Sequence, residues 1–265
     1  MSKSAVADPL GKAIKDHDTA QRGVEIVLVV DETGSMQARK PTTISAINEY
    51  LDSQRQSPLP AWVTMAFFNS EKKVQILHSG VDLKKVPNLV DKDYLPTGNT
   101  PLYDAIGQVV RDVEKRREQV KKDERPGVLF VVVTDGEENA STEFKKVDVS
   151  ALIAEKEKDG WTFVYIGAQR DAWQDGMNLG VAAGNTTGYM AANAADDLRA
   201  FSGTFKTLSA STAGYRTAVS YAAPGMSVGV AKNFWDDAAN LGNPDDQTNT
   251  VRIKSDTTTN EPPKP

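Results

Sequence analysis

The sequence predicts an α/β fold: a doubly wound, mostly parallel sheet with helices on both faces and one antiparallel edge strand. Two runs, at 24–31 and 127–133, are almost continuously apolar, as strands are when helices cover both faces of their sheet. Segments with the apolar spacing of helices follow these runs along the chain. Two further strands, at 62–68 and 73–83, are separated by a short Asn69-Ser70 connection, which indicates a hairpin and therefore the antiparallel edge.

The expected helices begin and end at proline and glycine signals. Pro41 lies in the first turn of a helix that ends before Pro58, and Pro101 opens another. A third helix runs to about Lys158 and is stopped by Gly160. The remaining expected elements are a strand at 161–166, a helix near 171–179, a short segment at 184–190 and a long helix at 196–222.

We expect one folded domain, at 23–222, between a flexible arm at 1–22 and a polar tail at 223–265 with a possible short helix. One pattern crosses this boundary, since Trp173, Asp175, Asn178, Leu179 and Gly180 have the spacing of Trp235, Asp237, Asn240, Leu241 and Gly242. Chance explains so short a match. The functional alternative is that the tail docks where the earlier helix docks, in this subunit or in a neighbour.

Composition excludes several classes of site. A net charge of -5 argues against nucleic acid as the main partner. The chain has no cysteine, which excludes disulfides and thiolate zinc sites, and of its two histidines His78 is expected to be an ordinary strand residue. The first residues lack the apolar core of a signal peptide, and no run is long enough to span a bilayer. We therefore expect a cytoplasmic protein, or a virion protein if a phage encodes it, with no membrane partner.

Oxygen-bearing side chains follow three separate segments of the expected sheet. Asp31, Thr33 and Ser35 come at the end of the first strand, Asp135 comes after the strand at 127–133, and Thr100 precedes a helix. The ligand crevice of an open α/β sheet lies outside the carboxyl ends of its strands, so these loops should meet there. Taken singly, each residue has a structural explanation, because serine and threonine cap helices and an acid often begins a turn.

Together, these side chains suit a hard divalent cation. Two carboxylates about 5 Å apart repel by about 3 kcal/mol at an effective dielectric constant of 20. A cation between them makes the total electrostatic interaction attractive. Ligation by oxygen alone favours Mg²⁺, with Mn²⁺ or Ca²⁺ as alternatives, and disfavours zinc. Because hydroxyl ligands are neutral, the ion would keep positive charge and an open position that an Asp or Glu of another molecule could fill.

At these residues the chain resembles the von Willebrand factor A domain family, whose metal-ion-dependent adhesion site combines an Asp-x-Ser-x-Ser loop with a distant Thr and a distant Asp. The loop stands here as DETGS and is followed by Met36, as in many bacterial members. The distant residues stand in GNTPLYDAI and VVVTDGEEN, and the similarity extends over about 23–221. The resemblance implies that Thr33, Ser35 and Thr100 bind the metal through hydroxyls, and that Asp31 and Asp135 act directly or through water. Thr33 replaces the usual Ser and keeps the hydroxyl.

The resemblance implies a reversible, cation-dependent protein-binding module and not an enzyme. Its expected partner supplies an Asp or Glu and is a AAA+ ATPase or an assembly component, while the oligomeric state and the bacterial or phage origin stay open. DETGS and TDGEEN also resemble haloacid dehalogenase-like phosphotransferases, in which Asp31 would be the nucleophile. That scheme gives the Thr100 loop no role. A structural assembly protein with a vestigial metal site is the third alternative.

Overall fold

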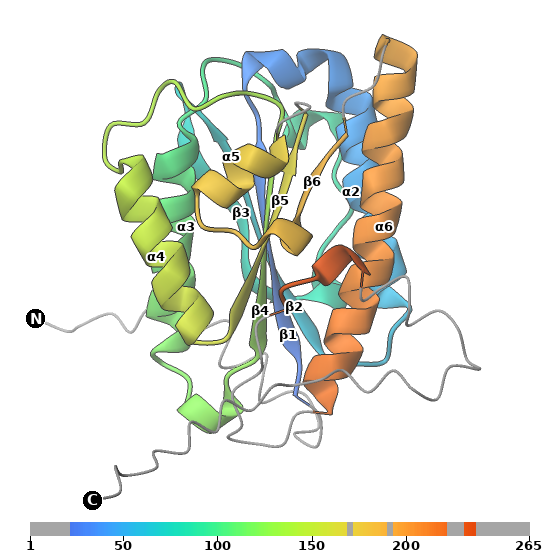
Figure 1. Cartoon of the computed structure of the whole chain (residues 1–265). Helices are drawn as coiled ribbons and strands as arrows, with labels where there is room; N and C mark the ends of the chain where they lie inside the picture. The colour runs from blue at the N-terminus through green and yellow to red at the C-terminus, as the bar shows by residue number, and fades with distance from the viewer. Residues whose placement is uncertain (1–21, 169–171, 190–192, 222–230, 237–265) are drawn as a thin grey trace, which may run out of the picture.

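A six-stranded sheet forms the centre of the computed structural model, which describes residues 22–168, 172–189, 193–221 and 231–236 (Figure 1). Its strand order is β3-β2-β1-β4-β5-β6. The strands are β1 (Val24–Asp31), β2 (Ala61–Asn69), β3 (Lys73–Asp82), β4 (Gly127–Thr134), β5 (Trp161–Gly167) and β6 (Thr186–Gly188). The helices are α2 (Lys40–Arg55), α3 (Leu102–Arg117), α4 (Lys146–Lys158), α5 (Ala172–Asn178) and α6 (Ala194–Ser220).

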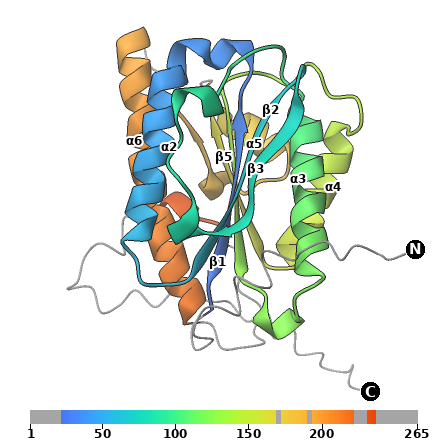
Figure 2. The same cartoon turned by 180° about the vertical axis from the view of Figure 1, so that it is seen from behind.

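Every neighbouring pair of strands is parallel except β2 and β3, which are antiparallel. β3 is an edge strand and follows β2 through a short turn, as the Asn69-Ser70 connection indicates (Figure 2). The prediction of a mostly parallel sheet with one antiparallel edge strand is therefore confirmed.

Two helical layers cover the two faces of the sheet. α2 and α6 lie side by side on one face, and α3 and α4 lie on the other (Figures 1 and 2). β1 is buried along its whole length because its alternate side chains enter both layers. Ile26, Leu28 and Val30 pack with the α2 and α6 side, and Val27 and Val29 pack with the α3 and α4 side. A strand covered on both faces has no position for solvent-facing polar residues, which accounts for the apolar run.

The strand order creates a topological switch point between β1 and β4. From β1 the chain continues through α2 to β2 on one side, and from β4 it continues through α4 to β5 on the other side. Since the two connections leave in opposite directions, the loops that follow β1 and β4 bound a crevice at the carboxyl edge of the sheet. Val30 of β1 pairs with Val133 of β4, so Asp31 and the residues after Thr134 emerge at the same level.

The expected helix signals coincide with the observed ends. Pro41 lies in the first turn of α2, where its missing N–H costs no intrahelical hydrogen bond. Gly160 follows α4 with φ 84°, a left-handed conformation that glycine adopts readily. A short 3-10 helix, η1 (Gly34–Arg39), joins the end of β1 to α2 and was not predicted.

Residues 231–236 pack against the domain beside β5 and β6. Phe234 is buried in the α2 and α6 side of the core, and its ring lies 6.4 Å from that of Tyr215. The side chain of Asn185 donates to the carbonyl of Ala231 and accepts from the Phe234 N–H, which anchors the segment at both ends. Of the predicted sequence repeat, residues 237–242 lie outside the described part of the chain, as do residues 1–21 of the expected arm.

Candidate metal centre

The carboxylate of Asp31 lies buried at the carboxyl end of β1. Asp31 is the last residue of β1 and has no exposed surface. One of its oxygens accepts from the backbone N–H of Thr33 at 2.8 Å, and the other accepts from the Thr134 hydroxyl at 2.6 Å. The side chain of Asp31 is therefore held by its own loop and by the end of β4.

A chain of hydrogen bonds connects the first loop to the loop after β4. The Ser35 hydroxyl donates to one carboxylate oxygen of Asp135 at 2.5 Å. The hydroxyls of Thr33 and Ser35 are 2.9 Å apart. Since Ser35 has a single proton, which goes to Asp135, Thr33 donates to Ser35 in this arrangement. Thr33 is buried whereas Ser35 is exposed, so the set of oxygens opens toward solvent at Ser35.

Thr100 belongs to the same cluster, which is visible from its position relative to Gly136. A methyl group in place of the Gly136 hydrogen would lie 3.1 Å from the Thr100 hydroxyl oxygen and 3.8 Å from that of Ser35. Thr100 is held there by two hydrogen bonds with Asn139, one to its N–H and one to its carbonyl. The third loop thus brings its hydroxyl to the first two, and the glycine leaves space between them.

Buried polar side chains fix the loops that carry the oxygens. The carboxylate of Glu32 accepts from the side chain of Asn69 at 2.8 Å and from the backbone N–H of Leu95 at 2.6 Å, and it forms an ion pair with Lys72. The hydroxyl of Tyr94 donates to the backbone carbonyl of Asp31 at 2.5 Å. The DETGS loop is therefore tied to the β2–β3 turn and to the segment before Thr100.

Arg39, at the end of η1, supplies the positive charge of this region. Its guanidinium donates to Asp135 at 2.8 Å and to Asp197, in the first turn of α6, at 2.6 Å. It also lies 5.7 Å above the centre of the Tyr189 ring, a distance typical of a cation–π contact. Asp135 consequently faces Ser35 with one oxygen and Arg39 with the other.

Burial changes the protonation of both acids. Burial raises the pKa of Asp31 to about 6, although its hydrogen bonds with Thr134 and Thr33 act in the opposite direction and the charge of Asp135 adds a smaller increase. Burial also raises the pKa of Asp135, against the lowering effects of Ser35 and Arg39. Both acids therefore gain from a nearby positive charge beyond that of Arg39, which is the condition for binding a cation.

All five residues that the sequence singled out lie around one point at the switch between β1 and β4. Two carboxylates and three hydroxyls form a donor set of hard oxygens, which fits Mg²⁺, Mn²⁺ or Ca²⁺ and does not fit zinc. The hydroxyl hydrogen bonds that now join these residues leave oxygen lone pairs for a cation. The residues that could hold a metal are Asp31, Thr33, Ser35, Thr100 and Asp135.

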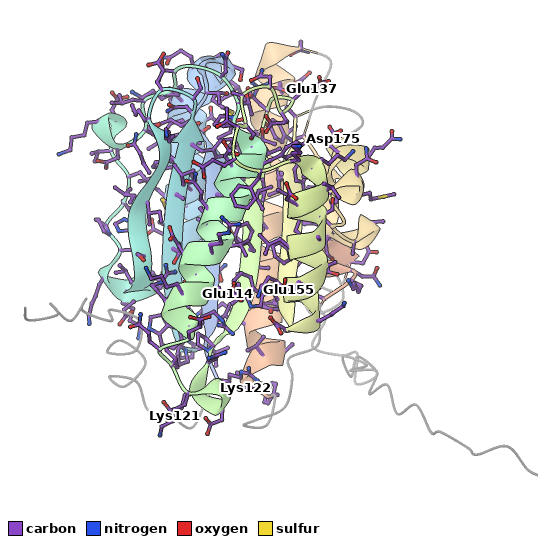
Figure 3. The ribbon with its side chains drawn as sticks, turned by 90° about the vertical axis from the view of Figure 1, so that its left-hand side faces the viewer. Glu114, Lys121, Lys122, Glu137, Glu155 and Asp175 are labelled. Carbon is purple, nitrogen blue, oxygen red and sulfur yellow. The ribbon has the colours of Figure 1, made fainter. Side chains whose placement is uncertain are left out.

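A second group of acids with the spacing of metal ligands lies on the α3 and α4 side of the molecule. Glu114, Glu155 and Asp159 bring their carboxylate oxygens within 4.8 Å of one another. The ammonium of Lys156 forms ion pairs with all three, so a side-chain cation already lies among these carboxylates. Glu114 and Glu155 lie well away from the carboxyl edge of the sheet (Figure 3). This group therefore offers no competing metal centre.

The strand order and the oxygen-lined crevice define a Rossmann-like α/β protein with its site at the topological switch point. The family model described as the von Willebrand factor type A domain matches residues 25–204. The chain belongs to this family. The recognition made from the DETGS, Thr100 and Asp135 motifs is thereby confirmed.

Two solved structures have a fold similar to that of this chain. A von Willebrand factor type A protein from Catenulispora acidiphila is 14% identical, with a TM-score of 0.53, and the match covers 73% of this chain and 43% of that one. The pilus adhesin SpaC from Lactobacillus rhamnosus GG is 14% identical, with a TM-score of 0.57, and the match covers 74% of this chain and 31% of that one. This chain thus corresponds to less than half of either protein. No curated protein sequence matches it.

Sequence reasoning missed the residues that support the five candidate ligands. Arg39 and Asp197 are 158 positions apart, so their ion pair has no local sequence signal. Glu32 and Thr134 each stand beside a predicted ligand, and that adjacency is the signal that could have identified them.

Among the described helices, none is both long and apolar enough to cross a membrane.

Proposed function

We propose that this chain is a divalent-cation-dependent protein-binding module, in which a metal held by the DETGS loop, Thr100 and Asp135 captures an Asp or Glu of a partner protein. Mg²⁺ is the expected ion, with Mn²⁺ or Ca²⁺ as alternatives. The partner is expected to be an acidic protein surface, such as that of a AAA+ ATPase or an assembly component.

One observation carries this proposal: oxygens from three loops gather around a single point, and the outermost of them is exposed. Ser35 donates a hydrogen bond to Asp135, and Gly136 lies beside the hydroxyls of both Ser35 and Thr100. When a metal is bound there it supplies a positive charge with an open coordination position. The role of this chain's residues is to hold that charge at the solvent-facing edge of the sheet. The pilus adhesin SpaC shares the fold, and its description as an adhesin agrees with a binding role.

The first prediction concerns Asp135→Ala. This change removes one of the two carboxylates and leaves the Ser35 hydroxyl without its acceptor, so Mg²⁺ affinity should fall at least tenfold. Titration calorimetry with MgCl₂ measures this directly. Capture of a partner from lysate should then require Mg²⁺ for the wild type and be lost in excess EDTA and in the variant.

The matched control is Asp123→Ala, the same change at an exposed acid of the η4 segment (Lys122–Glu124). The neighbouring Lys121 and Lys122 lie at the opposite end of the molecule from Glu137 (Figure 3). This control should bind Mg²⁺ and the partner as the wild type does. If partner capture survives in Asp135→Ala and in EDTA, the module is an assembly scaffold with a vestigial site.

The phosphotransferase alternative uses the same crevice but leaves Thr100 without a role. In this structure Thr100 has 3% of its surface exposed and its hydroxyl faces the cluster, which favours the binding function. Acid-stable incorporation of phosphate at Asp31 would revive the enzyme. Mg²⁺ binding without phosphatase activity would count against it.

A further inference from the structure

A polar pocket adjoins the metal centre on the side of α3, α4 and α5. Its volume is about 200 Å³, and its walls include Gly136, Glu137, Tyr103 and Tyr165. Gly136 is shared, because it also lies beside the hydroxyls of Thr100 and Ser35. A partner whose side chain reaches the metal would therefore have its neighbouring residues at the entrance of this pocket.

Acidic side chains outnumber basic ones in the lining of the pocket. Glu137, Glu138 and Asp175 are the acids among its described lining residues, and Lys146 is the base. Glu138 has a structural role, since its oxygens accept from the backbone N–H groups of Tyr103 and Ala140, among others. Glu137 is exposed and lies at the same end of the molecule as Asp175 (Figure 3). The acid at the rim is thus available to an incoming group.

Tyr165 provides a second observation, independent of the acids. Its side chain lines the pocket, and the residue is only 3% exposed. Burial, and to a smaller extent the charge of Asp175, raise the pKa of Tyr165, so the phenol stays neutral. The phenol oxygen can accept a hydrogen bond from an N–H donor that enters the pocket.

We propose that this pocket binds the cationic side chain, Lys or Arg, of the same partner whose acid reaches the metal. Carboxylates together with two tyrosine rings suit an ammonium or guanidinium group. The volume is below the range of small-molecule pockets and fits one side chain. The partner motif is then a Lys or Arg close to an Asp or Glu. The part of this inference that concerns the partner's acid rests on the proposed function. The part that concerns the cation in the pocket does not depend on it.

The first experiment tests the pocket without any acid. Butylammonium and ethylguanidinium chloride are titrated into the Mg²⁺-saturated protein, with the ring signals of Tyr103 and Tyr165 followed by NMR and with N-butylacetamide as the neutral control. Saturable changes in the chemical shifts of these rings are expected with the two cations and not with the neutral amide. They should weaken at least threefold in Glu137→Gln and in Tyr165→Phe, remain in Asp123→Asn, and strengthen in Lys146→Ala. Shifts that are absent, or equal with the neutral amide, overturn the inference.

The second experiment separates failure of the pocket from failure of the proposed function. Short synthetic peptides carrying one Glu and, one to four residues away, either Lys or Gln are compared in Mg²⁺ and in EDTA. The best Glu–Lys peptide should bind about fivefold more tightly than its Glu–Gln counterpart, as for one partly buried ion pair, and Glu137→Gln should remove the difference. Equal Mg²⁺-dependent binding of both peptides overturns the pocket alone. If neither peptide binds in Mg²⁺ while butylammonium and ethylguanidinium still bind in the pocket, the proposed capture of the acid is overturned and the pocket inference is supported.

Discussion

At the scale of single residues, protons and the proposed cation would compete for the carboxylate of Asp31. The pKa of its carboxyl is raised to about 6, so the folded protein keeps this proton at pH values where the unfolded chain, with a value near 3.8, has lost it. Without metal, the stabilisation that Asp31 contributes is therefore complete below about pH 4 and is lost as the pH rises toward 6.

Metal binding has the opposite pH dependence, because a cation needs the carboxylate. We predict that Mg²⁺ affinity falls about tenfold for each pH unit below about 6 and changes little above it. Titration calorimetry at pH 5, 6, 7 and 8 measures the slope. An affinity that is constant from pH 5 to 7 would mean that Asp31 is ionised throughout this range.

Arg39 replaces part of the charge that a metal would bring. We predict that Arg39→Met lowers the free energy of unfolding by about 2 kcal/mol without metal, since the partly buried carboxylates of Asp135 and Asp197 lose their counter-charge. Saturating Mg²⁺ should reduce this deficit, because the ion neutralises Asp135 in its place. Urea unfolding with MgCl₂ and with EDTA measures both values. The same deficit in both buffers would show that Arg39 and the cation act independently.

The candidate ligands could be predicted from sequence because each follows a recognisable segment end. Asp31 ends a buried apolar run and Asp135 follows another, so the carboxyl edge of a parallel sheet brings them together. Arg39 and Asp197 could not be paired, because their contact depends on where α6 begins relative to η1. In the structure, the guanidinium of Arg39 moderates the repulsion between carboxylates that the sequence indicates.

At the scale of elements, the segment at 231–236 contributes to the core of the domain. We predict that Phe234→Ala lowers the free energy of unfolding by about 3 kcal/mol or more, because the ring is 2% exposed and packs on Tyr215 and Trp235. Lys232→Ala, a change at an exposed residue of the same segment, is the control and should cost less than about 1 kcal/mol. Urea denaturation compares the two. Equal, small effects would show that the segment adds nothing to stability.

The fold was predictable where local patterns carry the information. Buried strands read as apolar runs, and Pro41 and Gly160 mark helix ends. Phe234 was not predicted as a core residue, because it stands in a polar stretch whose packing depends on distant partners such as Asn185. The division into arm, domain and tail remains a prediction.

At the scale of the whole molecule, Arg39 connects the metal centre to α6. α6 packs on α2 through polar contacts as well as apolar ones, since buried Arg216 donates to the carbonyls of Gln54 and Leu59. A change at Asp135 can reach the first turn of α6 through the ion pairs of Arg39 with Asp135 and Asp197.

We predict that Mg²⁺ together with an acidic ligand changes amide hydrogen exchange in the first turns of α6, because recruitment of Asp135 by the ion weakens the bridge from Arg39 to Asp197. The measurement compares protein with EDTA, with MgCl₂, and with MgCl₂ plus a Glu-containing peptide. Exchange in α4, which lies on the other face of the sheet, serves as the internal reference. Identical exchange in α6 under all three conditions would rule out the coupling.

The five side chains come from three loops that become neighbours only when β1 and β4 are paired and the segment before α3 is in place. A fragment that ends before β4 lacks Asp135 and therefore cannot carry the complete set. The proposed binding of an ion therefore depends on the assembled sheet, and it should be lost in the same unfolding transition as the tertiary structure. A misassembled copy would then also lack the proposed binding of a partner.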